Sequence, residues 1–307
     1  MLKIGSLFSG YGGLDRAVEQ VTGATPAWFV EYDAAPSKIL AHHWPDVPNH
    51  GDVTAVDWAT MPPVDILTGG YPCQPFSAAG QRKGTNDERH LWPYVREAIR
   101  VLRPRLAILE NVAGHRSLGF DRVLGDMAED GLHVRWTSLR ASDVGAPHHR
   151  ERLFILAAPA DPEGTRRDHG ETAHIGTTHR EVDAPRDDSH AAADSEDDGL
   201  ARTGPARHRR PRPADSSGGD IDWGPYTEAV QRWERLTRPA PAPTEPNTKG
   251  NPRLNAAFAE WMMGLPEGHV TQVPGISRAD QLKAIGNGVC PQQAAVALTT
   301  LLEKETF

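Results

Sequence analysis

The sequence predicts an α/β protein with a mainly parallel sheet and a small second lobe, and three observations support this. In the first 160 of the 307 residues, short β-rich runs alternate with helix-like stretches, the pattern of a parallel sheet covered by helices. Residues 161–222 then contain no Phe, Trp or Tyr. Beyond them, apolar residues return at helical spacing. We therefore expect one large domain and one smaller one.

The first 160 residues supply the elements of that sheet. Helix-like stretches are expected at 14–21, 35–43 and 93–102, the last with a proline in its first turn. The strand-like runs between them are rich in β-branched, aromatic and leucine residues. These runs read "KIGSLFS", "AWFVEYD", "VDILTGG", "LAILENV", "VRWTSL" and "LFILAA".

Beyond residue 160 the chain divides into three further parts. Segment 161–222 carries 15 Asp and Glu against 9 Arg and no Lys, with few aliphatic residues. Such a segment cannot bury enough apolar area to offset its chain entropy, so we expect an insertion that is disordered. Residues 223–275 are expected to form the small lobe. Residues 276–307 are expected to return to the large domain through a last helix, with Val296 and Leu298 facing a core.

Composition limits the class of protein. The formal net charge is −8, of which −6 belongs to segment 161–222, so the remaining −2 neither favours nor excludes a DNA partner. No apolar run approaches the roughly 20 residues of a membrane span. The chain opens directly on a strand-like run, so we expect no signal peptide. Two cysteines, Cys73 and Cys290, make neither a disulfide framework nor a metal cluster, and we expect a cytoplasmic protein without a metal site.

A glycine loop follows the first strand. In "LFSGYGGLD", Gly10, Gly12 and Gly13 stand between a strand and a helix, where the backbone can pass close to a ligand. Glu31 ends the second strand, where a carboxylate can accept hydrogen bonds from ribose hydroxyls. A dinucleotide would fit this pair, but Asp15 stands where the third glycine of that fingerprint belongs. A nucleoside without a pyrophosphate, such as S-adenosylmethionine, fits the loop better.

A cysteine loop follows the third strand-like run. Pro72 and Pro75 fix two backbone angles around Cys73, at the strand end where open α/β sheets carry their chemistry. A small buried cysteine in a turn is the alternative interpretation. The residues that follow form a basic, hydroxyl-bearing stretch suited to a phosphate backbone, namely Ser77, Gln81, Arg82 and Lys83. One strand further, "AILENVAG" delivers Glu110 to the same edge, and a carboxylate there is costly without partners.

With these motifs the chain resembles the C5-cytosine DNA methyltransferase family, across nearly its whole length outside 161–222. The resemblance rests on six segments in the family's order: "FSGYGG", "PCQPFSAAGQRKG", "ENV", "GAPHHRERLFI", "LNAAFAEWMMGLPEG" and "AIGNGVCP". It implies a class I methyltransferase fold, which is Rossmann-like, with a small target-recognition lobe. By the same resemblance, residues 1–160 would bind S-adenosylmethionine and carry the catalytic groups.

The resemblance also assigns catalytic roles. Cys73 would be the nucleophile that adds to carbon 6 of cytosine, which turns carbon 5 into a nucleophile for the methyl group. Glu110 would meet the charge at ring N3, and Arg152 would reach the base O2 while Arg150 supports the cysteine loop. His148 departs from the family pattern, which usually has Gln there.

The cofactor positions carried over from the family form a larger set. They are Phe8, Gly10, Gly12, Glu31, Tyr32, Asp52, Val53, Pro72, Leu91 and Asn287. Gly288 follows Asn287 where the family commonly has Ser, which removes one hydroxyl. Cys290 is expected to pack as a small apolar residue before the last helix.

The expected function is DNA (cytosine-5-)-methyltransferase activity of the bacterial or phage type, in restriction-modification or as a stand-alone protective methylase. The expected partner is double-stranded DNA, with a cognate restriction endonuclease as a further candidate, and the protein is expected to be a monomer. The alternatives are a transfer-RNA cytosine-5 methyltransferase, a catalytically inactive DNA-binding relative and, more distantly, a dinucleotide-dependent oxidoreductase. Neither the target sequence nor the base that removes the C5 proton follows from the sequence.

Overall fold

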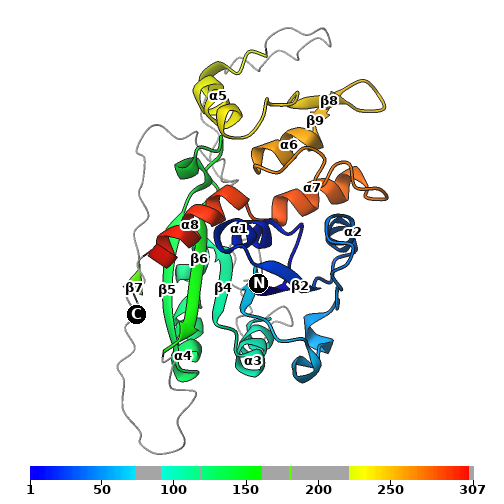
Figure 1. Cartoon of the computed structure of the whole chain (residues 1–307). Coiled ribbons are helices and arrows are strands. Elements are labelled where there is room, and N and C mark those ends of the chain that lie inside the picture. The colour runs from blue at the N-terminus through cyan, green and yellow to red at the C-terminus, as the bar shows by residue number, and fades with distance from the viewer. Residues whose placement is uncertain (73–90, 118, 161–179, 182–220, 304–307) are drawn as a thin grey trace, which may run out of the picture.

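A seven-stranded sheet forms the centre of the computed structural model, which describes residues 1–72, 91–117, 119–160, 180–181 and 221–303 (Figure 1). The strand order is β2-β1-β3-β4-β6-β5-β7. The strands are β1 Lys3–Leu7, β2 Thr25–Val30, β3 Ile66–Gly69, β4 Leu106–Val112, β5 Leu132–Leu139, β6 Arg152–Pro159 and β7 Arg180–Glu181. The pairs β1–β2, β1–β3, β3–β4 and β5–β7 are parallel, whereas β6 runs antiparallel to β4 and β5. The predicted α/β class with a mainly parallel sheet is therefore confirmed.

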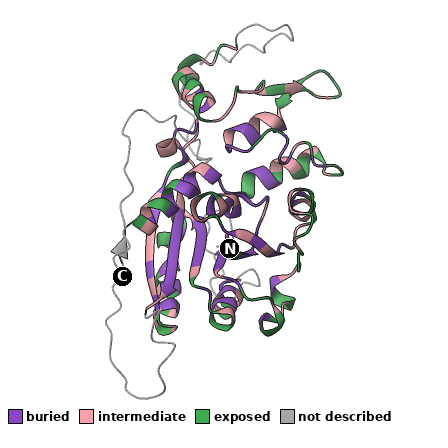
Figure 2. Ribbon diagram, in the orientation of Figure 1, coloured by how far each residue is buried: buried purple, intermediate pink, exposed green. Residues whose placement is uncertain are grey.

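Helices cover both faces of this sheet. The α-helices of the described residues are α1 Gly13–Thr22, α2 Ala34–His43, α3 Trp92–Leu102, α4 Phe120–Glu129, α5 Thr227–Leu236, α6 Ala256–Met262, α7 Arg278–Asn287 and α8 Pro291–Glu303, of which α5 and α6 belong to a second lobe. The helices expected near 14–21, 35–43 and 93–102 are present, within two residues at each end. On one face α1 packs against α8, and Leu14, Val18 and Leu298 share a core there. On the other face Trp92, Val95 and Val123 bring α3 and α4 onto the strands. Figure 2 shows the buried residues gathered on the central strands between these layers.

Two expectations for the end of the chain met different outcomes. Cys290 is fully buried, as predicted for a small packing residue. Val296 was expected to face a core together with Leu298, but it is 39 % exposed. Helix α8 therefore turns a narrower apolar face to the sheet than its sequence suggests.

A second lobe lies at one end of the molecule and contains α5, α6 and the hairpin of β8 (Thr244–Pro246) with β9 (Pro252–Leu254) (Figure 1). Trp233 and Trp261 are fully buried in it, and the Trp233 Nε1 donates to the Trp261 carbonyl at 2.9 Å. Of the apolar residues expected at helical spacing in this part of the chain, Val230 and Trp233 are buried, whereas Tyr226 is 50 % exposed. The hairpin, by contrast, is largely exposed (Figure 2).

Most of the predicted insertion 161–222 lies outside the described residues. Within it the structure describes β7, which pairs with β5. None of the helices in the described part of the chain combines the length and the apolar character that crossing a membrane requires.

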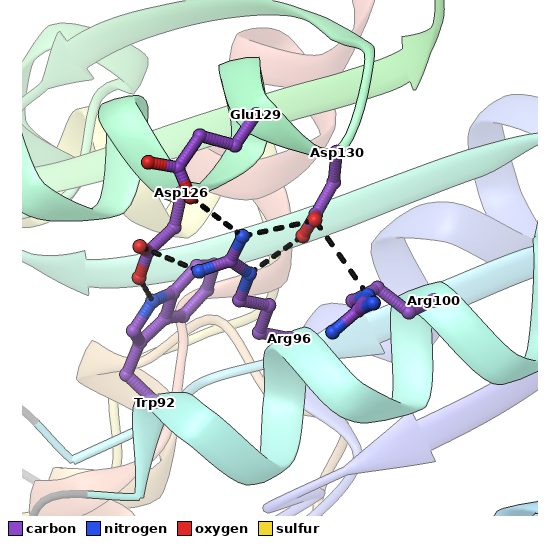
Figure 3. Close-up of polar contacts among 6 residues, drawn as sticks. All are labelled: Trp92, Arg96, Arg100, Asp126, Glu129 and Asp130. Atoms are coloured by element: carbon purple, nitrogen blue, oxygen red, sulfur yellow. Dashed lines mark hydrogen bonds and ion pairs between the residues drawn. The ribbon is translucent and has the colours of Figure 1, made fainter.

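An arginine on α3 holds α4 in place beneath the sheet (Figure 3). The Arg96 guanidinium binds Asp130 through two nitrogens at 2.7 and 2.9 Å, and Asp126 at 2.7 Å. Glu129 accepts a further bond from it at 3.0 Å. Trp92, the first residue of α3, donates its indole N–H to the same Asp126 at 2.7 Å. A bidentate pair of this kind fixes orientation, so the start of α3 is anchored directly after segment 73–90.

Candidate functional site

The predicted site residues gather where β1, β2, β3 and β4 end. Parallel strands place their carboxyl ends at one edge, which is where open α/β sheets bind ligands. The register confirms the alignment, because Leu7 of β1 pairs with Val30 of β2 and with Gly69 of β3, and Gly69 pairs with Leu109 of β4. Phe8, Glu31 and Gly70 directly follow β1, β2 and β3, and Glu110 lies near the end of β4, two residues before Val112.

Glu31 fixes the glycine loop through its carboxylate. Its Oε2 accepts the backbone N–H of Gly10 at 2.8 Å, and its Oε1 accepts that of Asp33 at 2.7 Å. Burial raises the pKa of Glu31, although these two backbone N–H groups oppose the shift. Gly10 and Gly12 have φ of 56° and 79°, and Phe8 adopts a φ of 52°, so the loop needs backbone conformations that most side chains disfavour. Glu31 is thus a brace for this loop as well as a candidate ribose ligand.

The segment between α2 and β3 passes alongside β2 and approaches Glu31. Asn49 joins the two, because its Oδ1 accepts the Glu31 N–H at 2.9 Å and its Nδ2 donates to the Glu31 carbonyl at 3.0 Å. Three residues on, the Asp52 Oδ1 accepts both the N–H and the hydroxyl of Thr54, at 2.9 and 2.8 Å. Val53 is buried, whereas the ring of Tyr32 is 75 % exposed. The Tyr32 ring is thus accessible to a ligand, and the Asp52 carboxylate is held in one orientation by Thr54.

A small cavity of about 40 Å³ lies between the glycine loop and the end of β4. Its lining combines the predicted cofactor residues Phe8, Gly10 and Asn287 with Gly70 and the predicted catalytic residue Glu110. The structure therefore brings the two predicted groups into one recess. Gly70 is needed there, since a Cβ at this position would stand 3.3 Å from the Glu110 Oε2.

Glu110 and Arg152 form a buried pair. The Arg152 Nε lies 3.0 Å from the Glu110 Oε1, and their side chains are 17 % and 11 % exposed. The antiparallel register explains the meeting, because Arg152 pairs with Val112, two residues beyond Glu110 on the same strand. Burial raises the pKa of Glu110, and the charges of Arg152 and Arg150 only partly offset this. The carboxyl group is thereby disposed to carry a proton and to donate it in a hydrogen bond.

Arg150 turns toward the closing motif. Its Nη2 donates to the carbonyls of Gly286 and Gly288, at 2.9 and 2.5 Å. The predicted support of the cysteine loop by Arg150 lies beyond what the described residues test. His148, at the position that departs from the family pattern, contacts the second lobe, with its Nε2 2.9 Å from the Met262 carbonyl.

Several predicted site residues lie outside the described residues, namely Cys73, Ser77, Gln81, Arg82 and Lys83. The two ends of that segment are described. Before it, the Tyr71 hydroxyl lies 2.9 Å from the His115 Nε2, and the Asn111 Nδ2 donates to the Tyr71 carbonyl at 3.0 Å. After it, Leu91 leads into Trp92, whose ring lies 5.4 Å from that of Tyr71. Pro72 is exposed at the first end.

Sequence reasoning missed the residues that hold this frame together. Asn49, Asn111 and His115 each bridge two segments by hydrogen bonds, yet each is an ordinary polar residue in the sequence. Asn111 had one usable signal, since it belongs to the "ENV" segment. The contacts of Asn49 and His115 arise only when distant segments are folded together.

Tyr11 and Gly288 interlock across the cofactor recess. Tyr11 is fully buried and its hydroxyl donates to the Val289 carbonyl at 2.8 Å. A Cβ at Gly288 would overlap the Tyr11 ring. Glycine at position 288, where the family commonly has serine, therefore goes together with Tyr11, whose ring occupies the space of the serine side chain.

Gly288→Ser is expected to destabilise the protein by about 1–3 kcal/mol through overpacking. Combining it with Tyr11→Ala should cost less than the sum of the two single changes, with a coupling of about 1 kcal/mol or more, because the second change vacates the space. Denaturant unfolding of the four proteins measures this cycle. Gly125→Ser is the matched control, since a Cβ there meets nothing within 4 Å. Strict additivity would contradict the interlock.

Asp15 is a fully buried carboxyl at the start of α1. It accepts hydrogen bonds from the hydroxyls of Ser6 at 2.9 Å and Thr68 at 2.6 Å. Burial raises the pKa of Asp15 from 3.8 to about 6, against the effect of those hydroxyls. A raised folded-state pKa stabilises the protein at low pH, and that contribution is lost as the pH rises from about 4 through 6.

Asp15→Asn should remove this pH dependence. The free energy of unfolding of the variant, relative to the wild type, is expected to rise by up to about 3 kcal/mol between pH 4 and pH 7. Urea unfolding at a series of pH values measures the difference. Parallel curves for the two proteins would show that Asp15 ionises as easily in the folded chain as in the unfolded one.

A larger groove of about 1310 Å³ lies at the opposite edge of the sheet. Basic and acidic side chains line it together, among them Arg100, Arg103 and Asp130, and it contains none of the predicted site residues. In the described segments no group of three or more His, Cys, Asp or Glu is placed to hold a metal ion. The smaller recess at the carboxyl edge, by contrast, is lined by the predicted site residues Phe8, Gly10, Glu110 and Asn287.

Comparison with known families gives a match over almost the whole chain. The family described as "C-5 cytosine-specific DNA methylase" matches residues 2–303. Among curated proteins, Type II methyltransferase M.Bsp6I of Bacillus sp. (strain RFL6) is 33 % identical over 163 residues, which are 51 % of this chain and 52 % of that protein. Orphan methyltransferase M.SPRI of Bacillus phage SPR is 34 % identical over 169 residues, 52 % of this chain and 38 % of that protein. The chain thus spans about half the length, or less, of these relatives.

Solved structures share the fold at low sequence identity. The S. pombe Dnmt2 methyltransferase superposes with a TM-score of 0.63 at 15 % identity, covering 100 % of both chains. A putative DNA modification methyltransferase encoded within an E. coli prophage gives a TM-score of 0.58 at 19 % identity, covering 99 % of both. These structures agree with the described arrangement of sheet and lobe.

Proposed function

Since the chain belongs to the C-5 cytosine-specific DNA methylase family, we propose that it is a DNA (cytosine-5-)-methyltransferase that uses S-adenosylmethionine. The observation that carries the proposal is the buried Glu110–Arg152 pair beside the glycine loop. A family member without activity has no need to keep a carboxyl group with a raised pKa in a recess shared with the cofactor residues.

The residues present fit the cofactor. The strained glycine loop lets a ligand approach the backbone at Phe8, Gly10 and Gly12. Glu31 offers its remaining lone pairs to ribose hydroxyls, while the exposed Tyr32 ring suits the face of an adenine. The remaining positions proposed to hold the cofactor are Asp52, Val53, Pro72, Leu91 and Asn287. When bound, S-adenosylmethionine supplies an electrophilic sulfonium methyl group.

The protein's own groups would prepare the cytosine. The Cys73 thiolate adds to carbon 6, and the electron pair of the 5,6 double bond becomes available at carbon 5 for the methyl group. Glu110, in its protonated form, donates a hydrogen bond to ring N3, where negative charge develops. Arg152 keeps Glu110 in place and is positioned to reach the base O2. Transfer of the C5 proton to a solvent base then returns its electron pair to the 5,6 double bond and expels the Cys73 thiolate.

The substrate we propose is duplex DNA from which one cytosine has been extruded, because carbon 5 and carbon 6 are inaccessible in a stacked helix. The second lobe, 223–275, would face the duplex across from residues 1–160, with Ser77, Gln81, Arg82 and Lys83 contacting phosphates. We place the protein in the cytoplasm as a monomer, in restriction-modification with a cognate endonuclease or as a stand-alone protective methylase.

Purified protein, duplex DNA and S-adenosylmethionine labelled in its methyl group test this proposal. After digestion of the product to nucleosides, the label should be found only in 5-methyl-2′-deoxycytidine. A parallel incubation with transfer RNA distinguishes the proposed DNA methyltransferase from the main alternative, a transfer-RNA cytosine-5 methyltransferase. Label confined to RNA, or found on adenine, would exclude the proposed activity, and no label at all with tight DNA binding would indicate an inactive relative.

A further inference from the structure

A glutamine in the first turn of α8 occupies a position that no catalytic role explains. Gln293 is fully buried. Its Nε2 donates to two carbonyls, that of Leu139 at 2.6 Å and that of Arg150 at 2.9 Å. Its Oε1 is also buried and finds no hydrogen-bond partner in the described part of the chain. Burying the Oε1 acceptor without a partner costs free energy, so the two hydrogen bonds that Nε2 donates must offset this cost.

The two carbonyls mark the two ends of one loop, residues 140–151, which we call the arginine loop. Leu139 is the last residue of β5, and Arg150 stands two residues before Arg152, the first residue of β6. Leu139 also pairs directly with Arg152 across the two strands. One side-chain amide therefore ties together the entrance and the exit of the loop that delivers Arg150 and Arg152.

The exit of this loop is conformationally demanding. Arg150 has a φ of 36°, a left-handed conformation that a residue with a side chain adopts only when its surroundings enforce it. The hydrogen bond from Gln293 to the Arg150 carbonyl fixes the orientation of the following peptide. Two residues later, the Arg152 Nε must reach the Glu110 Oε1, which it does at 3.0 Å. A relaxed φ at Arg150 would change the direction from which Arg152 enters the site.

We infer that Gln293 is a positioning residue for methyl transfer, which sets the arginine loop so that Arg150 and Arg152 meet their partners. This role rests on the proposed function. The neighbouring glutamine faces elsewhere, since the Gln292 Nε2 donates to the Gly264 carbonyl at 2.7 Å. Consecutive glutamines of α8 thus hold two different segments, Gln292 the end of α6 and Gln293 the arginine loop.

Gln293→Met tests the inference, because it keeps the length of the side chain and removes its N–H donors. Methyl transfer is measured in a single turnover at saturating S-adenosylmethionine, with cofactor affinity and thermal unfolding measured on the same samples. We expect a folded protein with wild-type cofactor affinity and a transfer rate lowered by about 100-fold, the size of effect that a small misplacement of catalytic groups produces. Gln20→Met is the matched control, an exposed glutamine on α1 that should retain the wild-type rate.

A double-mutant cycle with Arg152→Lys gives a readout that a purely structural role would not move. If Gln293 acts through Arg152, the double variant should be little slower than Arg152→Lys alone. Independent, multiplicative losses would overturn the inference. So would a wild-type rate in Gln293→Met, or variants that simply unfold, since the inference requires the loop rather than the fold to depend on this amide. An inactive wild-type protein would instead refute the proposed function.

Discussion

Cys73→Ala is expected to abolish methyl transfer, lowering the rate by roughly 10⁴-fold or more. Without the thiolate, carbon 5 of cytosine has no route to sufficient nucleophilicity, and removal of a covalent nucleophile is among the most damaging changes to an enzyme. The measurement is the single-turnover rate with labelled cofactor on duplex DNA. The same variant should fail to form a covalent complex with DNA that contains 5-fluorocytosine, which the wild type should form in the presence of cofactor.

Cys290→Ala is the natural control for that experiment. Cys290 is fully buried, and burial raises the pKa of its thiol to about 11, so it is a poor source of thiolate at neutral pH. Its replacement should leave formation of the covalent complex intact. A complex that persists in Cys73→Ala and disappears in Cys290→Ala would reverse the assignment of the nucleophile.

Glu110→Gln should lower the rate of methyl transfer by about 100-fold or more, the usual size of a lost general acid. Glutamine keeps the shape of the side chain but cannot supply an acidic proton to ring N3. The wild-type reaction needs both the Cys73 thiolate and a protonated Glu110, so its rate should pass through a maximum and fall on the alkaline side as the pH rises through the raised pKa of Glu110. The variant should lack this fall.

The pH–rate profile of kcat for both proteins measures this effect. Glu97→Gln, on the exposed face of α3, serves as the matched control and should reproduce the wild-type profile. An unchanged alkaline fall in Glu110→Gln would show that another group controls the proton, and an unchanged rate would remove Glu110 from the mechanism.

The sheet was predictable because its signals are local. Alternation of apolar runs with helical periodicity identifies the layers, and glycine or proline marks the strand ends at Gly10, Gly12 and Pro72. The antiparallel direction of β6 was not predictable in this way, since strand direction depends on how the connection between β5 and β6 folds. The exposure of Val296 was not predictable for a similar reason. Helical periodicity identifies the apolar face of α8, but not how much of that face the neighbouring elements cover.

Only the candidate site residues with reactive or charged side chains could be predicted from the sequence. Glu110 stood out as a polar group at the end of an apolar strand, whereas Arg152 was expected only from the family resemblance, and the structure joins the two. The residues that orient them did not stand out, because Asn49, Asn111 and Gln293 act by hydrogen bonds to backbone atoms far away in the chain. The need for glycine at position 288 was not predictable either, because it follows only from the Tyr11 ring, which occupies the space that a side chain at this position would need.

Bisulfite sequencing of DNA from a host that expresses the gene tests the central claim most directly. The claim predicts cytosines that resist conversion at one recurring short sequence, in cells with the intact gene and not in cells with Cys73→Ala. The position of these cytosines would also give the target that the sequence leaves open. Complete conversion of host DNA, with the protein expressed and folded, would contradict the claim that this chain methylates cytosine in DNA.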